Sequence, residues 1–288
     1  MKYACIDRRR DRYPVRLMCR LLRVSASGYY AWRTRLESSR TKSNRQLMAE
    51  IKRAHEASKG VYGSPRVHAE LVATGVRVGR HKVARLMRLA RLRGCPKRRF
   101  RVTTQANPAH AVAKNLLKQN FTADTPNRRW VADITYIPTH QGWLYLAVVM
   151  DLYSRRIVGW SMSRWMSRRL VLAALRMAIE ARQPEGELIH HSDRGGQYTS
   201  DDFRDELAKH GIDCSMSGSG NCYDNAAMES FFASLKRERV NRVRYRTRDQ
   251  ARADIFDFIE VFYNRKRRHS YLGNISPNDF EEQSIGSF

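Results

Sequence analysis

The chain has few acidic residues. Its 288 residues include 28 Asp and Glu against 54 Lys and Arg, which gives a formal net charge of +26. Solubility needs only a modest charge of either sign, so this excess indicates attraction to a polyanion. Nucleic acid fits best, because basic side chains bind it by releasing its condensed counterions. An acidic membrane surface fits less well, since the sequence shows no basic amphipathic helix with an exposed aromatic face.

Long apolar segments and several cofactor motifs are also missing. The longest uninterrupted apolar run, residues 143–150, is far short of the roughly 20 residues that cross a bilayer, and the start MKYACIDRRRDR has no apolar signal core. We therefore expect no membrane contact and a cytoplasmic location. Five scattered cysteines without a C-x-x-C pair predict reduced thiols and no structural zinc. Without a Gly-x-x-x-x-Gly-Lys loop, we expect no nucleotide cofactor.

Hydrophobic periodicity divides the chain into a basic helical front and an α/β rear. A polar, Pro-containing stretch at residues 102–125 is predicted to be the linker between them. Within residues 1–44, a helix at 15–22 is followed by a tight turn and a second helix that carries Tyr29 and Trp32. Two short helices with such a turn are typical of a helix-turn-helix.

A second helix-turn-helix-like, DNA-binding domain is predicted at residues 45–101. Its last helix carries an apolar stripe at Val83, Leu86, Met87 and Ala90. The opposite face is basic, as suits contact with phosphates. That face consists of Arg80, Lys82, Arg85, Arg88 and Arg91. A helical hairpin with solvated arginines is the alternative, and the continuation PKRRFR favours DNA binding over it.

The rear alternates between strand and helix patterns. Three strands joined by short turns predict an antiparallel meander, which is followed by helix, strand, helix, strand and helix. This order predicts an α/β fold: a ribonuclease-H-like mixed five-stranded sheet with flanking helices, preceded by the all-α helix-turn-helix region. We expect the catalytic core at residues 126–240 and a basic helical extension at residues 241–288.

Three acids are placed in apolar settings. Asp133 lies in the first strand, Asp193 follows the fourth strand, and Glu229 lies early in the last helix of the core. On the predicted plan they meet at one edge of the sheet, where α/β folds bind ligands. Hard cations bind carboxylate oxygens, and two such ions can clamp an in-line phosphoryl displacement. We therefore predict catalytic, metal-binding acids that hold Mg²⁺ or Mn²⁺, two ions in all; three ordinary surface acids are the alternative.

Neighbouring residues offer further candidates. Lys236 lies two helical turns after Glu229 on the same face, where it could hold a DNA phosphate or be an ordinary exposed lysine. Asp151 is interpreted as a turn or capping residue. Adjacent strand residues point to opposite faces, so at most one of His190 and His191 can face the site, and a structural role is favoured. The stretch SMSGSGNCYDN is expected to be mobile, with Asp224 or Asn225 capping the next helix.

Six motifs occur in the same order as in a known family. They are YGSPRVHAEL, WVADITYI, DLYSRRIVGW, HSDRGGQYTS, NAAMESFFASLKRE and FYNRKRRHSYLGNISPNDF, and they cover most of the chain from about residue 45 to 280. They resemble the DDE transposases of bacterial insertion sequences, specifically the OrfB-type protein of the insertion sequence three family, which is related to retroviral integrases. The resemblance implies that Asp133, Asp193 and Glu229 form the metal-binding triad and that Lys236 contacts the transposon-end DNA.

The chain also departs from its relatives. It lacks the N-terminal His/Cys zinc module of retroviral integrases, so no zinc is expected. In this family an upstream frame with a zipper is commonly joined to the catalytic frame, and no heptad zipper is present here. An upstream-frame partner protein or fusion is therefore implied as an alternative to a complete transposase.

We predict a bacterial, nucleoid-associated transposase that cleaves and joins DNA ends in a metal-dependent reaction. Its expected partners are the terminal inverted repeats, the target DNA and further copies of itself assembled on DNA. A DNA-binding regulator with an inert core is the first alternative. The second is a ribonuclease-H-like nuclease that hydrolyses an RNA–DNA hybrid.

Overall fold

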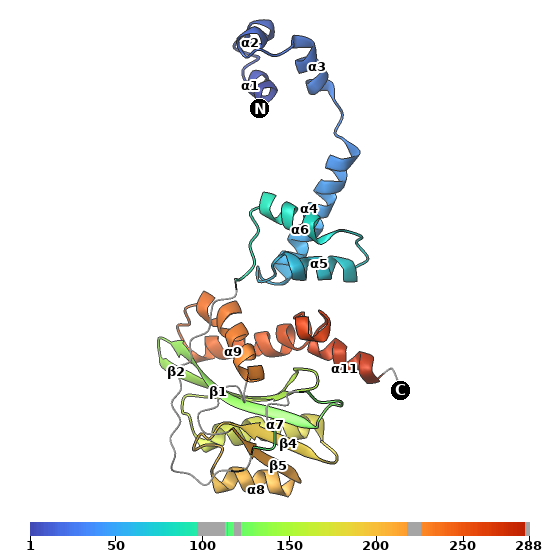
Figure 1. Ribbon diagram of the computed structural model, residues 1–288. Helices are drawn as coiled ribbons and strands as arrows, with labels where there is room; N and C mark the ends of the chain where they lie inside the picture. Colours follow the sequence, from blue (N-terminus) through green and yellow to red (C-terminus); the bar gives the residue numbers. More distant parts are fainter. Residues whose placement is uncertain (97–112, 114, 118–121, 218–225, 286–288) are drawn as a thin grey trace.

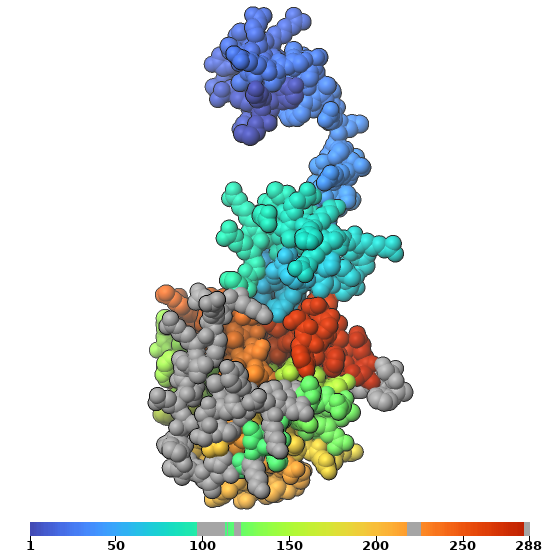
Figure 2. Space-filling model, viewed as in Figure 1, coloured from blue at the N-terminus to red at the C-terminus, as the bar shows by residue number. Residues whose placement is uncertain are grey.

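A computed structural model describes residues 1–96, 113, 115–117, 122–217 and 226–285. Figure 1 shows three parts in a row: a small N-terminal group of helices, a second helical group, and a sheet flanked by helices. In the space-filling view of Figure 2, only a narrow column of residues joins the N-terminal group to the rest. No helix in the described residues is both long and apolar enough to span a membrane.

The N-terminal group has a small core of its own. It consists of α1 (Lys2–Asp7), α2 (Val15–Leu21) and α3 (Ala26–Thr34). Ser25 starts α3, since its hydroxyl accepts a hydrogen bond from the Gly28 backbone N–H at 3.2 Å. The two helices predicted here are confirmed. The buried side chains of this core are Ile6, Met18, Cys19 and Tyr29.

The second helical group is reached through a long helix. That helix, α4 (Ser39–Ala57), packs with α5 (Ser64–Ala73) and α6 (Arg80–Leu89). Gly75 lies between α5 and α6 at φ +85°, a left-handed conformation that glycine adopts without strain. The α5–turn–α6 pair therefore has the predicted order of two helices and a glycine turn.

The stripe predicted for α6 is largely buried. Val83, Leu86 and Met87 lie in the main core, together with residues of α4 and α5. Ala90 is only half-buried, because α6 ends one residue before it. The helix therefore presents its apolar side inward and leaves its arginines outside.

The α/β part contains a five-stranded sheet of order β3-β2-β1-β4-β5. β1 pairs with β2, and β2 with β3, in antiparallel fashion, whereas β4 is parallel to both β1 and β5. This confirms the predicted ribonuclease-H-like arrangement of an antiparallel meander extended by parallel strands. The strands are β1 (Arg129–Thr139), β2 (Gly142–Asp151), β3 (Ile157–Ser163), β4 (Leu188–Ser192) and β5 (Ile212–Met216).

Helices cover both faces of the sheet. Alternation along β1 sends Trp130 and Ala132 to the face covered by α7 (Arg168–Arg182) and α8 (Asp201–Lys209). The other face packs against α9 (Ala226–Glu238), as Figure 1 shows. Because both faces are covered, the central strands are apolar along most of their length.

The C-terminal extension runs across the second face of the sheet. Its elements are the 3-10 turn η2 (Val240–Arg242), α10 (Arg248–Phe256), the π-helical η3 (Asp257–Tyr263), the 3-10 turn η4 (Ser270–Leu272) and α11 (Pro277–Ile285). Phe258, Ile259 and Tyr263 are buried in the same core as the strands. The extension is therefore an integral part of the sheet domain.

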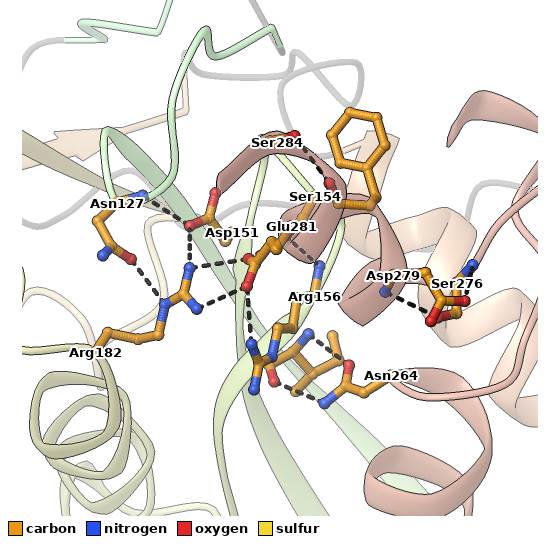
Figure 3. Close-up of polar contacts among 12 residues, drawn as sticks. Asn127, Asp151, Ser154, Arg156, Arg182, Asn264, Ser276, Asp279, Glu281 and Ser284 are labelled. Atoms are coloured by element: carbon orange, nitrogen blue, oxygen red, sulfur yellow. Dashed lines mark hydrogen bonds and ion pairs between the residues drawn. The ribbon is translucent and has the colours of Figure 1, made fainter. Parts of the chain in front are cut away.

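A buried ion-pair cluster, shown in Figure 3, ties α11 to the sheet. Glu281 accepts hydrogen bonds from two nitrogens of Arg182, at 2.8 and 2.9 Å, and from Arg156 at 2.8 Å. Arg182 also pairs with Asp151 at 3.4 Å, and the Asp151 carboxylate accepts from the Tyr153 N–H at 2.9 Å. Asp151 is thus a turn residue, as predicted, and in addition a member of this cluster.

Part of the predicted linker packs on the sheet domain. Leu117 is buried in the main core. The Leu116 backbone N–H donates to the Ser215 hydroxyl at 3.0 Å. These described residues of the 102–125 stretch therefore contribute to the folded domain.

Candidate active site

The parallel strands β1 and β4 stop pairing near the middle of the sheet, and an aspartate comes shortly after the last pair on each chain segment. The last paired residues are Val131 on β1 and His191 on β4. Asp133 comes two residues later on β1, and Asp193 two residues later in the chain after β4. Two carboxylates therefore leave neighbouring parallel strands at the edge where α/β sheets bind ligands.

The third acid is brought to this edge by α9. Glu229 lies in the first turn of the helix, between buried residues that pack on the face of the sheet to which Val131 belongs. Alternation along β1 puts Asp133 on that same face. Asp133 and Glu229 are half-buried, whereas Asp193 reaches the surface.

Short backbone contacts orient both aspartates. The Ile134 N–H donates to Asp133 Oδ1 at 2.7 Å. The Gly195 N–H donates to Asp193 Oδ1 at 3.0 Å, and a Cβ on Gly195 would lie 3.0 Å from the same oxygen. Glycine at this position lets the turn after Asp193 close tightly against its carboxylate.

The electrostatics of the site disfavour three negative charges. Burial raises the pKa of Asp133 to about 7, and the carboxylates of Asp193 and Glu229 add to the rise. The Ile134 N–H and the Lys236 ammonium oppose it. Loss of hydration also raises the pKa of Asp193 and of Glu229. A bound cation would relieve this repulsion.

The donor set fits a hard cation. Its members are carboxylate oxygens, which Mg²⁺ and Mn²⁺ accept as ligands. Within the described residues, no three His, Cys, Asp or Glu side chains are already close enough together to hold a metal ion. The three acids are therefore neighbours that would have to draw closer around an ion.

Lys236 lies at the same edge, on the face of α9 predicted from its spacing to Glu229. Its ammonium is 4.7 Å from the centroid of the Tyr136 ring, and burial lowers the pKa of Lys236 while the charge of Asp133 opposes the change. Tyr136 and its neighbour Trp143 are both exposed. Sequence reasoning missed these two aromatic residues, although their place at the end of a strand hairpin was visible.

The far end of α9 is held by a buried salt bridge. Glu238 accepts from Arg267 Nε and Nη2, both at 2.8 Å, and Arg267 also donates to the Ser234 hydroxyl at 3.0 Å. Although burial opposes it, Arg267 holds the pKa of Glu238 below its usual range. Sequence reasoning assigned no role to this pair, whose only signal was the basic run NRKRRHS.

The two histidines of β4 point to opposite faces, as predicted. His191 contacts the hydroxyls of Ser215 at 2.8 Å and Ser217 at 3.3 Å. His190 is buried against the rings of Phe203 and Tyr198. Both are therefore packed inside the domain. The predicted helix caps Asp224 and Asn225 lie outside the described residues.

The predicted DNA-binding residues of α6 belong to the second helical group. Arg80, Arg85 and Arg88 are exposed, and Lys82 is half-buried. This group adjoins the α/β part, since Arg66 of α5 approaches Glu238 to within 3.6 Å. The basic helix and the acid site therefore belong to two domains in direct contact.

Comparisons with known proteins agree with this division. Two family models, each described as an integrase core domain, match residues 123–222 and 229–285, and a model described as an HTH-like domain matches residues 42–100. The chain is 43% identical over 288 residues to the InsF transposase for insertion sequence IS3A of Escherichia coli K12, covering 99% of this chain and 100% of that one. An insertion element IS600 protein of Shigella sonnei is 48% identical over 266 residues, or 92% of this chain and 98% of that protein.

Solved structures of viral integrases are more distant. The simian T-cell lymphotropic virus intasome matches with 13% identity and a TM-score of 0.47, covering 81% of this chain and 74% of that one. The HTLV-2 integrase catalytic core domain in complex with magnesium matches with 16% identity and a TM-score of 0.40, covering 51% and 92%.

Proposed function

This chain belongs to the InsF transposases of IS3-type insertion sequences, and we propose that Asp133, Asp193 and Glu229 are the residues that carry out its DNA cleavage and joining. It is an enzyme of transposition with an integrase core and an HTH-like domain, and its substrate is DNA. The observation that supports the assignment of residues is the convergence of three acids, from strand β1, the turn after β4 and helix α9, at one edge of the sheet.

The acids are proposed to hold two Mg²⁺ or Mn²⁺ ions. At this site two bound ions would supply activation of water or a 3′-hydroxyl and stabilisation of the leaving 3′-oxygen. Burial, together with the charges of Asp193 and Glu229, raises the pKa of Asp133, and this unfavourable concentration of negative charge supports the binding of cations here. The Gly195 turn keeps Asp193 oriented toward the same edge.

The basic residues are proposed to position the DNA. Lys236, beside Asp133, holds a phosphate near the scissile bond. On the HTH-like domain, the basic face of α6 holds the DNA backbone at a greater distance from the scissile bond, as helices of this kind do. The residues of that face are Arg80, Lys82, Arg85 and Arg88.

The proposed assembly contains more than one copy of the chain. Joining two element ends to a target requires the terminal inverted repeats and the target DNA to be held together, which a homo-oligomer on DNA would do at the bacterial nucleoid. An upstream-frame partner or fusion would add recognition of the repeats. We propose the limits 1–44 and 45–101 for the two helical segments and 126–240 for the catalytic core, with Leu117 of the predicted linker and the described part of the 241–288 extension packed into that core.

Strand transfer tests the assignment. A labelled duplex with a 3′-hydroxyl and the terminal sequence of the element that encodes this chain is incubated with plasmid, in Mg²⁺ or in EDTA. Wild type is expected to join the two DNAs only with Mg²⁺. Asp133→Asn, Asp193→Asn and Glu229→Gln are each expected to abolish joining while the duplex is still retained on the protein.

A matched control is Asp213→Asn, which alters an exposed aspartate on β5 and is expected to join at the wild-type rate. Joining by Asp193→Asn at the wild-type rate would show that the acids are misassigned. If wild type binds but does not join, adding the upstream-frame protein distinguishes a missing partner from an inert core.

A further inference from the structure

Two large aromatic side chains are exposed together at the end of the β1–β2 hairpin. Tyr136 is 53% exposed and Trp143 is 48% exposed. Their ring centroids are 4.9 Å apart with an interplanar angle of 76°, an edge-to-face pair. Such a paired aromatic surface in water is typical of a binding site.

This aromatic pair adjoins the proposed active site. Tyr136 lies three residues after Asp133 on β1, so alternation turns its side chain to the opposite face of the strand, and the link to the acids is made by Lys236. The Lys236 ammonium sits 4.7 Å from the Tyr136 ring centroid, and its charge acts on Asp133. One cationic side chain therefore connects the acids with the aromatic pair.

The backbone under the pair is held by the C-terminal extension. Arg248 Nε donates to the Trp143 carbonyl at 3.1 Å, and the Arg248 N–H donates to Gln141 Oε1 at 2.9 Å. The His140 N–H donates to the Tyr245 carbonyl at 3.0 Å. The hairpin is therefore fixed in place while both rings stay open to solvent, which lowers the entropic cost of binding a flat ligand.

We propose that Tyr136 and Trp143 form a stacking platform for an unpaired base of the DNA end. This rests on the proposed function, because the base belongs to the strand whose phosphate Lys236 holds. Bases inside a duplex already stack on each other, so the occupant is a base that has left the duplex next to the cleavage site. The surrounding positive charge of Lys236 and Arg248 complements the phosphates on either side of that base.

Aromatic stacking binds bases without strong dependence on sequence and changes affinity by roughly 5- to 150-fold per base. The pair would therefore favour DNA ends that are unpaired over ends that are fully paired. It would not by itself select the sequence of the repeat.

The test compares dissociation constants of two labelled duplexes, measured by fluorescence anisotropy in EDTA. One duplex is blunt, and the other carries a short unpaired 3′ overhang. Wild type is expected to bind the overhang duplex more tightly. Tyr136→Ala and Trp143→Ala are each expected to lose this preference by roughly 5-fold or more, whereas Tyr136→Phe and Trp143→Phe, which keep an aromatic ring, retain it.

Tyr271→Ala is the matched control. Tyr271 is 60% exposed and has the Arg155 guanidinium 4.5 Å from its ring centroid, but Arg155 lies beyond the opposite end of β2 from Trp143. This variant is expected to keep the wild-type preference. Equal binding of the two duplexes by wild type, or an unchanged preference in Tyr136→Ala and Trp143→Ala together, would overturn the platform.

Failure of the platform and failure of the metal-site assignment are distinguishable, because the binding assay in EDTA needs no ion. Asp193→Asn is expected to keep the overhang preference while losing strand transfer. If Asp193→Asn still joined DNA and still preferred the overhang duplex, the metal-site assignment would be wrong and the platform would be supported.

Discussion

Some buried side chains of the sheet domain lie where protonation is disfavoured, and His190, three residues before Asp193, is a clear case. Neither imidazole nitrogen has a hydrogen-bond partner among the described residues. Burial, with a smaller contribution from His191, lowers the pKa of His190 to about 3. The side chain is thus neutral in the folded protein at pH 7 and resists protonation.

This lowered pKa predicts acid sensitivity. An unfolded histidine titrates near its ordinary pKa of about 6.5. In the folded state the imidazole is protonated only when the pH falls to about 3, its lowered pKa. The stability that His190 contributes is therefore fully present above about pH 6.5 and is lost as the pH falls toward 3, by about 1.4 kcal/mol per pH unit.

The substitution His190→Met removes the titrating group and its unpaired nitrogens while keeping an apolar side chain. Urea unfolding at pH 7 and pH 5 is expected to show a smaller loss of stability on acidification than in wild type. An equally steep loss in His190→Met would show that other groups control acid unfolding.

At the scale of elements, α9 is the helix that couples the acid site to the rest of the molecule. It carries Glu229 and Lys236 near the site and Glu238 at its far end. Arg267 binds Glu238 with two hydrogen bonds in a buried setting. The rotation of α9, and with it the direction of the first two side chains, depends on this anchor.

Removing the anchor is expected to be costly. Arg267→Ala leaves the Glu238 carboxylate buried without its main partner, and breaking such a pair typically destabilises a fold by about 3–5 kcal/mol. The midpoint of urea unfolding measures the loss. Arg204→Ala, which breaks an exposed pair with Asp201, is expected to change stability by no more than about 1 kcal/mol. Equal effects in both variants would contradict a special role for the buried pair.

The Glu281 cluster makes a second prediction for an element. Glu281→Ala removes the shared acceptor of Arg182 and Arg156, so α11 is expected to detach from the turn between β2 and β3. Hydrogen exchange should rise both in α11 and at residues 152–156. The adjacent exposed Glu282 offers the control, because Glu282→Ala removes a charge without touching the cluster. Unchanged protection in Glu281→Ala would show that apolar packing alone holds α11.

At the scale of the whole molecule, the net charge of +26 is divided between domains that contact each other. The Tyr62 hydroxyl donates to the Lys266 carbonyl at 3.1 Å and accepts from the Arg268 N–H at 2.9 Å. Lys59 pairs with Asp257 at 2.6 Å. These contacts attach the HTH-like domain to the C-terminal extension, so DNA bound by one domain is held at a defined place relative to the other.

The basic face of α6 predicts a salt effect. Each phosphate contact that is lost lowers the slope of log affinity against log salt concentration by about 0.9. The double variant Arg85→Gln with Arg88→Gln is therefore expected to reduce the slope by up to about 2. Neutralising Arg204 and Lys209 on α8, at the far end of the core in Figure 1, is the control and should change it little. Equal slopes in wild type and the α6 variant would show that this face does not bind DNA.

Much of the fold was predictable because its signals are local. Alternating side chains in β1 and β2 and the 3.6-residue spacing in α6 follow from the backbone geometry of single elements. The three acids stood out against a sequence that is poor in acids, and the transposase relatives favour strand transfer over the regulator and hybrid-nuclease alternatives.

The sequence by itself determined the types and order of the elements, the excess of positive charge and the kind of chemistry available, since these depend on composition and on neighbours along the chain. Only the tertiary structure decided which distant side chains meet. Arg267 and Glu238 are 29 residues apart, and Arg182 and Glu281 are 99 apart. Neither pair has a local signal, nor does the contact of Lys236 with Tyr136, because such contacts depend on the path of the whole chain.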